Sequence, residues 1–108
     1  MRDYQIYKKI DHIIKTRNKC LYSQNKGDED YRFLGMFKYC LFSMKEEFKL
    51  ILDNSYFKKK YQFWWVDYYC KSSYYRKRFK AVSAFVALFE MIYENFNDDS
   101  YFINFAKF

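Results

Sequence analysis

The single histidine of the chain, His12, is the residue best suited to acid–base chemistry. General acid–base catalysis and the activation of nucleophiles rely most often on a histidine that has a positioned partner. The sequence contains no glycine-rich phosphate loop, no G-x-S-x-G motif and no H-E-x-x-H motif that would supply such a partner. We therefore predict that the protein is not an enzyme.

The three cysteines, Cys20, Cys40 and Cys70, are odd in number and widely separated along the chain. Zinc sites usually pair their ligands at C-x₂₋₄-C spacing, and disulfide frameworks use an even number of cysteines. The sequence therefore predicts neither a disulfide nor a metal site. It indicates a reducing, intracellular compartment, such as the cytoplasm of a bacterium or of a host cell. Each cysteine falls on or beside an expected core face, where a thiol packs as a small hydrophobic group.

Two acids, Glu90 and Glu94, lie four residues apart and share one face of an expected helix. Dimetal sites in helical bundles combine such glutamates with Glu-x-x-His motifs on partner helices. The sequence has no such motif, so we expect both carboxylates to be solvated. We predict no metal and no cofactor.

The most informative feature of the sequence is the stretch from Lys58 to Lys80. It contains eight basic residues and one acid, Asp67, so its formal charge of +7 equals that of the whole chain. The same stretch is rich in aromatic residues and includes adjacent pairs such as Trp64-Trp65. Neighbouring residues of a helix point about 100° apart. One member of each aromatic pair is therefore expected to leave the core face.

Cations mixed with partly exposed aromatic rings fit three interpretations. Protein interfaces are enriched in Trp, Tyr and Arg at their energetically important positions. Sites for single-stranded nucleic acid combine cations, which hold phosphates, with rings that stack on bases. In the third interpretation, Lys and Arg side chains cover an aromatic core with their stems while their charges stay in water.

We predict a non-catalytic interaction module that binds a protein, in the manner of an assembly subunit or of a virus- or phage-type inhibitor. A subunit that binds RNA or single-stranded DNA within a ribonucleoprotein complex is the second hypothesis. A membrane surface is a less favoured partner, because the apolar side of the basic segment is needed for the core. The predicted partner-binding residues are Lys59, Lys60, Phe63, Trp65, Val66, Lys71, Arg76, Lys77 and Arg78.

Helices are expected to position these residues, because the chain lacks the residues that form tight turns. It contains no proline and two glycines, whereas hydrophobic residues make up 51% of its length. Proline and glycine end helices and form turns, so their scarcity favours long helices over a many-stranded fold. The sequence predicts a single domain over residues 1–108. Its fold class is all-α, a compact bundle of about four amphipathic helices.

The positions of these helices follow from apolar residues at steps of three and four. The segment from Ala81 to Tyr93 is apolar nearly all round, so we expect it at the centre of the bundle. Ser72-Ser73 is expected to separate the third helix from the fourth, and one continuous helix over residues 56–96 is the alternative. Asp28 or Asp30 is expected to cap the second helix. The expected helices cover residues 3–22, 28–51, 56–71 and 73–96, and a short aromatic tail covers residues 101–108.

Overall fold

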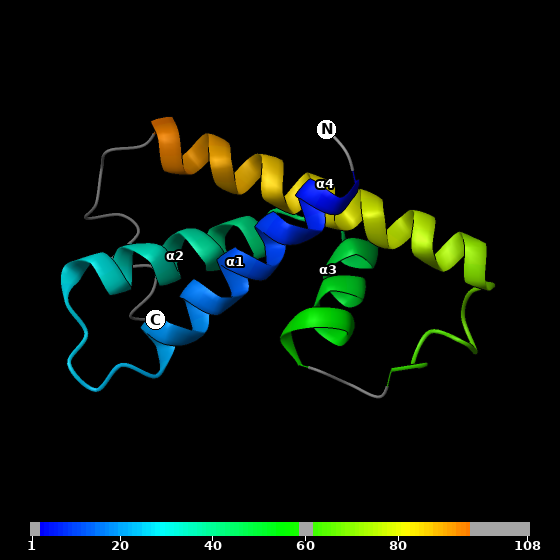
Figure 1. Cartoon of the computed structure of the whole chain (residues 1–108), viewed down its shortest axis with the longest axis horizontal. Helices are drawn as coiled ribbons and strands as arrows, with labels where there is room; N and C mark the ends of the chain where they lie inside the picture. The colour runs from blue at the N-terminus through cyan, green and yellow to red at the C-terminus, as the bar shows by residue number, and fades with distance from the viewer. Residues whose placement is uncertain (1–2, 59–61, 96–108) are drawn as a thin grey trace.

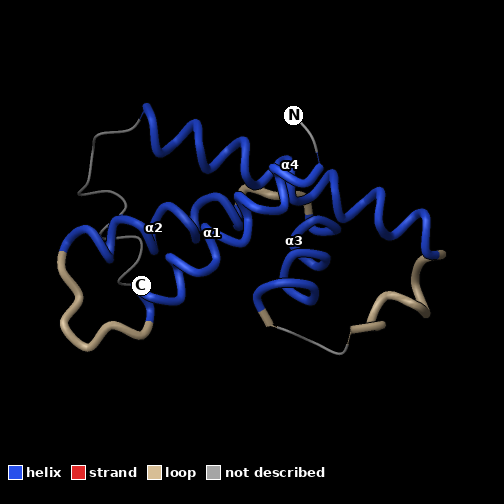
Figure 2. The backbone as a smooth tube through the Cα atoms, viewed as in Figure 1, coloured by secondary structure: helices blue, strands red, loops and turns tan. Residues whose placement is uncertain are grey.

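The computed structural model describes residues 3–58 and 62–95. Within these residues the structure contains helices and turns and no strand (Figures 1 and 2). The predicted all-α bundle of about four helices is confirmed, while the predicted aromatic tail lies outside the described residues. None of the helices in this part of the chain is long and apolar enough to cross a membrane. The elements are α1 (Asp3–Leu21), α2 (Asp28–Phe42), α3 (Glu46–Leu52), the π-helical turn η1 (Asp53–Phe57) and α4 (Lys71–Asn95).

The central element of the bundle is α4, which packs against α1, α2 and α3. In Figure 1, α4 runs along the length of the molecule, and α3 lies against its N-terminal half. Phe85 of α4 is fully buried, and its ring contacts Phe37 of α2 and Phe57 of η1 at centroid distances of 5.3 and 5.9 Å. The prediction that residues 81–93 lie at the centre is confirmed. The segment is nevertheless not buried all round, because the apolar side chains of Ala87 and Met91 face solvent.

The loop between α1 and α2 ends at Gly27, which is the N-cap residue of α2. The backbone N–H of Gly27 donates a hydrogen bond to the Asp30 carboxylate at 3.2 Å. Asp28 and Glu29 lie in the same first turn, where negative charge opposes the positive end of the helix dipole. The expectation that Asp28 or Asp30 is the N-cap is therefore wrong, because Gly27 holds the cap position and Asp30 acts from the third residue of the helix.

The predicted second helix over residues 28–51 is divided into two in the structure. Apolar residues continue at steps of three and four through the break, so this spacing alone does not reveal where the helix ends. Helix α2 ends at Ser43, whose hydroxyl donates a hydrogen bond to the Tyr39 carbonyl at 2.8 Å. Glu46 and Glu47 then begin α3, where acids favour a helix start. Ser43, followed three residues later by Glu46 and Glu47, is the sequence signal of this break.

The predicted third helix over residues 56–71 is wrong. The structure has η1 at Asp53–Phe57 and a series of turns over residues 62–68. Aromatic and β-branched residues, which dominate this stretch, favour helices only weakly. Turn hydrogen bonds replace the helical ones, such as the bond of 2.9 Å from the Tyr68 N–H to the Trp65 carbonyl. Tertiary packing of the rings therefore decides the conformation, and α4 begins at Lys71, so residues 56–96 are not one continuous helix.

Candidate functional site

The aromatic loop, residues 62–70, is attached to the bundle through Trp65. The indole of Trp65 is buried and stacks on the ring of Tyr74, with a centroid distance of 4.6 Å and an interplanar angle of 6°. The expectation that Trp65 lies on the partner-binding surface is therefore wrong. Because residues 62–68 form turns rather than a helix, the side chain of Trp65 can turn inward onto α4.

Hydrogen bonds to Ser55 of η1 also hold the aromatic loop. The Ser55 hydroxyl bonds to the phenol of Tyr74 at 2.6 Å and accepts a hydrogen bond from the Trp64 indole N–H at 3.3 Å. The wide turn of η1 places Ser55 between the loop and α4. The loop is thus connected to two separate helical elements.

Lys77, a predicted partner-binding residue, lies in a contact network centred on Glu47 of α3. Its ammonium group donates hydrogen bonds of 3.2 and 3.1 Å to the two carboxylate oxygens of Glu47. The hydroxyl of Tyr69 donates to the same carboxylate at 3.2 Å. The hydrogen bonds from Lys77 are the main reason that the pKa of Glu47 is lowered. Lys77 therefore links α4 to α3 and offers less charge to a partner than the sequence indicated.

Arg78, another predicted partner-binding residue, is only partly exposed and lies among tyrosine rings. Its guanidinium carbon is 4.8 Å from the ring centroid of Tyr75, 5.0 Å from that of Tyr7 and 5.8 Å from that of Tyr74. Cations over aromatic faces are stabilised by the negative charge of the ring faces. Like Lys77, Arg78 is engaged within the fold.

The remaining described residues of the predicted site face solvent. Phe63 and Val66 are 46% and 56% exposed, as expected for residues that bind a partner. Two tyrosines that the predicted site omitted, Tyr68 and Tyr75, are 71% and 40% exposed. Their neighbours in sequence, Tyr69 and Tyr74, are the more buried members of each pair. The adjacent tyrosines were therefore the sequence signal that one ring of each pair is exposed. Lys71 and Arg76 are also exposed, while Lys59 and Lys60 lie outside the described residues.

These residues form what we call the exposed aromatic surface. Phe63 belongs to the loop and Tyr75 to α4, but their rings contact the same buried indole. Each ring lies edge-on to Trp65, at centroid distances of 6.4 and 6.0 Å. Trp65 thus serves as a buried base that joins the loop to the start of α4. The exposed aromatic surface consists of Phe63, Val66, Tyr68, Lys71, Tyr75 and Arg76.

Cys70 immediately precedes α4, next to Lys71 of this surface, and is exposed. A hydrogen bond from the backbone of Ser73, followed in importance by the hydroxyl of Ser72, lowers the pKa of its thiol. The expectation that Cys70 packs on a core face is wrong, because the expected third helix does not form. Cys20 and Cys40 are buried as expected, and burial raises their thiol pKa values to about 11 and about 12.

We expect Cys70 to react with a thiol reagent such as DTNB far faster than the other cysteines. The thiolate is the reactive form, and both access and a lowered pKa favour it at Cys70. In the native protein, one thiol per chain should react in a fast phase, and Cys70→Ser should remove that phase. Fast release of two or three equivalents from the native protein would contradict the burial of Cys20 and Cys40.

Of the groups considered for chemistry, His12, Glu90 and Glu94 line one groove between α1 and α4, whereas none of the three cysteines lines it. His12 is exposed on α1, where its backbone carbonyl accepts a hydrogen bond from the Thr16 hydroxyl at 2.9 Å. Glu90 forms an ion pair of 2.7 Å with Lys9, which corrects the expectation that it is simply solvated. Within residues 3–58 and 62–95, no cluster of His, Cys, Asp or Glu side chains is suited to holding a metal ion.

The fold and this surface define the class of molecule as a small helical bundle with a cluster of exposed aromatic and cationic side chains on one loop and the adjoining helix. Comparisons of the chain with known protein families, with curated proteins and with solved structures find no match.

Proposed function

We propose that the protein is a non-catalytic interaction module that binds another protein through the exposed aromatic surface. The observation that carries this proposal is the exposure of four large apolar side chains, Phe63, Val66, Tyr68 and Tyr75, on one loop and the adjoining helix. Grouped apolar side chains bordered by charge are typical of binding sites, since burying them removes apolar area from water.

The charges of the surface indicate the kind of protein partner. Lys71 and Arg76 are exposed, and one acid, Asp67, is exposed on the same loop between Val66 and Tyr68, so the cations outnumber the acid. Tyrosine and arginine are favoured at interface positions because they combine a large contact area with polar groups. An acidic or mixed surface with apolar side chains of its own is therefore the best complement.

A single-stranded nucleic acid is the second candidate, and the exposed tyrosines beside Arg76 are the observation that favours it. Rings of this kind stack on bases while a neighbouring cation holds phosphate. Three contacts within the fold weigh against it. Lys77 is paired with Glu47, Arg78 lies among tyrosine rings, and Trp65, one of the two indoles of the loop, is buried.

A double variant tests the proposal, because it removes one apolar anchor and one cation from the surface. We expect Phe63→Ser with Arg76→Glu to abolish capture of the partner from native lysate of the source organism, measured by quantitative mass spectrometry. Exposed substitutions away from special features change stability by about 0.5 kcal/mol or less. The helix content and thermal midpoint should therefore stay close to those of the wild type.

The matched control is Leu50→Ser with Lys15→Glu, which makes the same changes elsewhere on the molecule. Leu50 is 46% exposed, the same fraction as Phe63, and Lys15 is exposed on α1. The control should capture the partner as the wild type does. Equal capture by both double variants would refute the assignment of this surface. Loss of salt-dependent binding to homopolymeric RNA or single-stranded DNA in the Phe63 variant alone would instead support the nucleic-acid candidate.

A further inference from the structure

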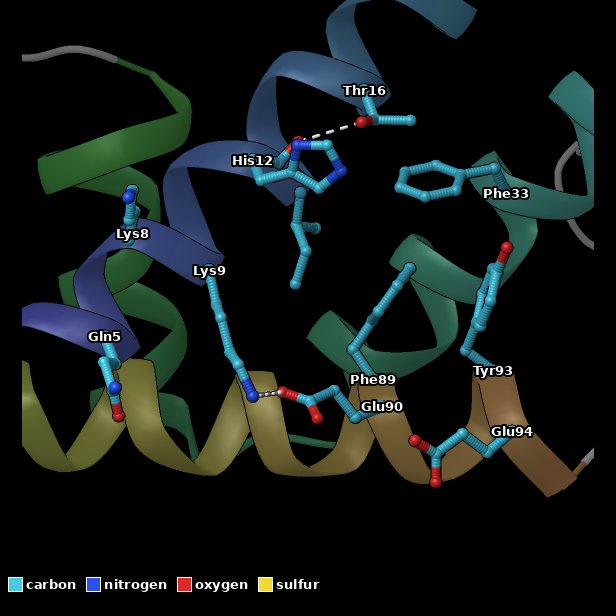
Figure 3. Close-up of a pocket in the computed structure, with 11 residues that line it drawn as sticks. Gln5, Lys8, Lys9, His12, Thr16, Phe33, Phe89, Glu90, Tyr93 and Glu94 are labelled. Atoms are coloured by element: carbon cyan, nitrogen blue, oxygen red, sulfur yellow. Dashed lines mark hydrogen bonds and ion pairs between the residues drawn. The ribbon is translucent and has the colours of Figure 1, made fainter. Parts of the chain in front are cut away.

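A groove lies between α1 and α4, away from the exposed aromatic surface (Figure 3). Its volume is about 950 Å³, and its floor is apolar, formed by Ile13 of α1, Phe33 of α2 and Phe89 of α4. Ligand pockets occupy roughly 300–1,000 Å³, so this groove has room for several apolar side chains. Tyr93, which is exposed, forms part of the α4 wall.

The two walls of the groove carry opposite charges. Lys8 and Lys9 line the α1 wall, whereas Glu90 and Glu94 line the α4 wall. Lys9 reaches across to Glu90, with 2.7 Å between its nitrogen and the carboxylate, so these two charges compensate each other (Figure 3). The exposed Lys8 on one wall and the exposed Glu94 on the other remain to act on an occupant. The groove is therefore apolar in the middle, basic along one edge and acidic along the other.

We infer that this groove binds an amphipathic helix of a partner protein, whose apolar stripe has acidic residues along one flank and basic residues along the other. The α1 wall from Gln5 to Thr16 covers about three helical turns at ~1.5 Å per residue. A helix in a groove is anchored by apolar side chains at i, i+3, i+4 and i+7, a span of about 10.5 Å that the α1 wall exceeds. The acidic flank of the bound helix lies toward Lys8, and its basic flank lies toward Glu94.

Opposite charges on the walls also fix the direction of the bound helix. Reversing an amphipathic helix in a groove exchanges its two flanks while its apolar face stays on the floor. One direction therefore pairs both flanks with opposite charges, and the other places like charges together. A helix with the same charge on both flanks meets a like charge on one wall in either direction, which disfavours its binding.

Three labelled peptides test the inference with the full chain at low ionic strength. Each has about 16 residues, roughly four and a half turns, and the same leucine stripe. The first has Glu on one flank and Lys on the other, the second has Glu on both flanks and the third has Lys on both. We expect fluorescence anisotropy to show binding of the mixed peptide about 3- to 5-fold tighter than the others, as surface ion pairs allow.

Glu94→Lys should switch this preference, because it makes both walls basic. The peptide with Glu on both flanks should then bind tightest. The control Glu29→Lys changes the net charge equally at an exposed position of α2 outside the groove and should keep the wild-type preference. Tyr93→Ala should weaken all three peptides by about tenfold, as the loss of an exposed aromatic anchor does.

Several results would overturn the inference. They are equal binding of the three peptides, no binding of any of them, and the same switch in the Glu29 control. A concentration-dependent dimer that Glu94→Lys abolishes, measured by sedimentation, would assign the groove to a second copy of the chain and also overturn it. The exposed aromatic surface is unchanged in all these variants, so the test is independent of the function proposed above.

Discussion

Replacing Phe85 with alanine is expected to lower the free energy of unfolding by about 3–5 kcal/mol, the usual cost of removing a buried phenylalanine ring. Phe85 is fully buried at the centre of α4, and its ring contacts Phe37, Phe57 and Phe89. Its removal leaves a cavity between elements from three parts of the chain, which limits how far the surroundings can relax. Denaturant unfolding followed by circular dichroism measures the loss.

Met91→Ala provides the control on the same helix. Met91 is exposed, so we expect its substitution to change stability by about 0.5 kcal/mol or less. Small domains have total stabilities of about 5–15 kcal/mol, so the Phe85 variant should be partly unfolded at moderate temperature. If the two variants unfold at the same denaturant concentration, α4 is not the centre of the bundle.

Trp65→Ala is expected to have an effect of similar size, about 3–5 kcal/mol, on a residue that the sequence placed at the surface. The buried indole stacks on Tyr74 and is the base on which Phe63 and Tyr75 rest. Its loss should destabilise the fold and disorder the exposed aromatic surface, so that partner binding falls as well. Unfolding monitored by tyrosine fluorescence or circular dichroism gives the stability change.

Two further substitutions distinguish the contribution of the Trp65 indole to stability from those of its exposed neighbour and of the Tyr74 hydrogen bond. Val66→Ala changes the exposed neighbour and should leave stability within about 0.5 kcal/mol of the wild type. Tyr74→Phe keeps the stacked ring and removes the hydrogen bond to Ser55, which should cost about 1 kcal/mol. A Trp65→Ala variant as stable as Val66→Ala would show that the indole is exposed in solution.

The elements that could be predicted from the sequence are those with a long, regular apolar period. The first helix was expected over residues 3–22 and is observed at Asp3–Leu21. The central position of residues 81–93 was expected from their apolar character and is observed in α4, where one face of this segment is buried. In both cases local periodicity and tertiary packing favour the same structure, so no other information was needed.

The predictions failed where tertiary contacts override local preference. The apolar spacing of residues 56–71 fits a helix, but the stacking of Trp65 on Tyr74 and the hydrogen bond from Trp64 to Ser55 hold residues 62–68 in turns. The break between α2 and α3 was missed because Ser43 interrupts the helix without interrupting its apolar spacing.

The candidate site could be predicted in part. Phe63 and Val66 were predicted to bind a partner, and both are exposed, although no helix forms there. The burial of Trp65 and the pairing of Lys77 with Glu47 could not be predicted, because they depend on residues distant in the sequence. The groove between α1 and α4 likewise requires knowing that these two helices are neighbours.

The position of α4 in the chain has a consequence for biosynthesis. The helix on which α1, α2 and α3 pack is synthesised after all three of them. While the ribosome is translating the first 70 residues, the apolar faces of α1, α2 and α3 have no central helix to cover them. Exposed apolar surface on an incomplete chain favours aggregation and binding by chaperones. Folding of the nascent chain must therefore await the emergence of α4 from the exit tunnel, and a translational pause before Lys71 would prolong the vulnerable interval.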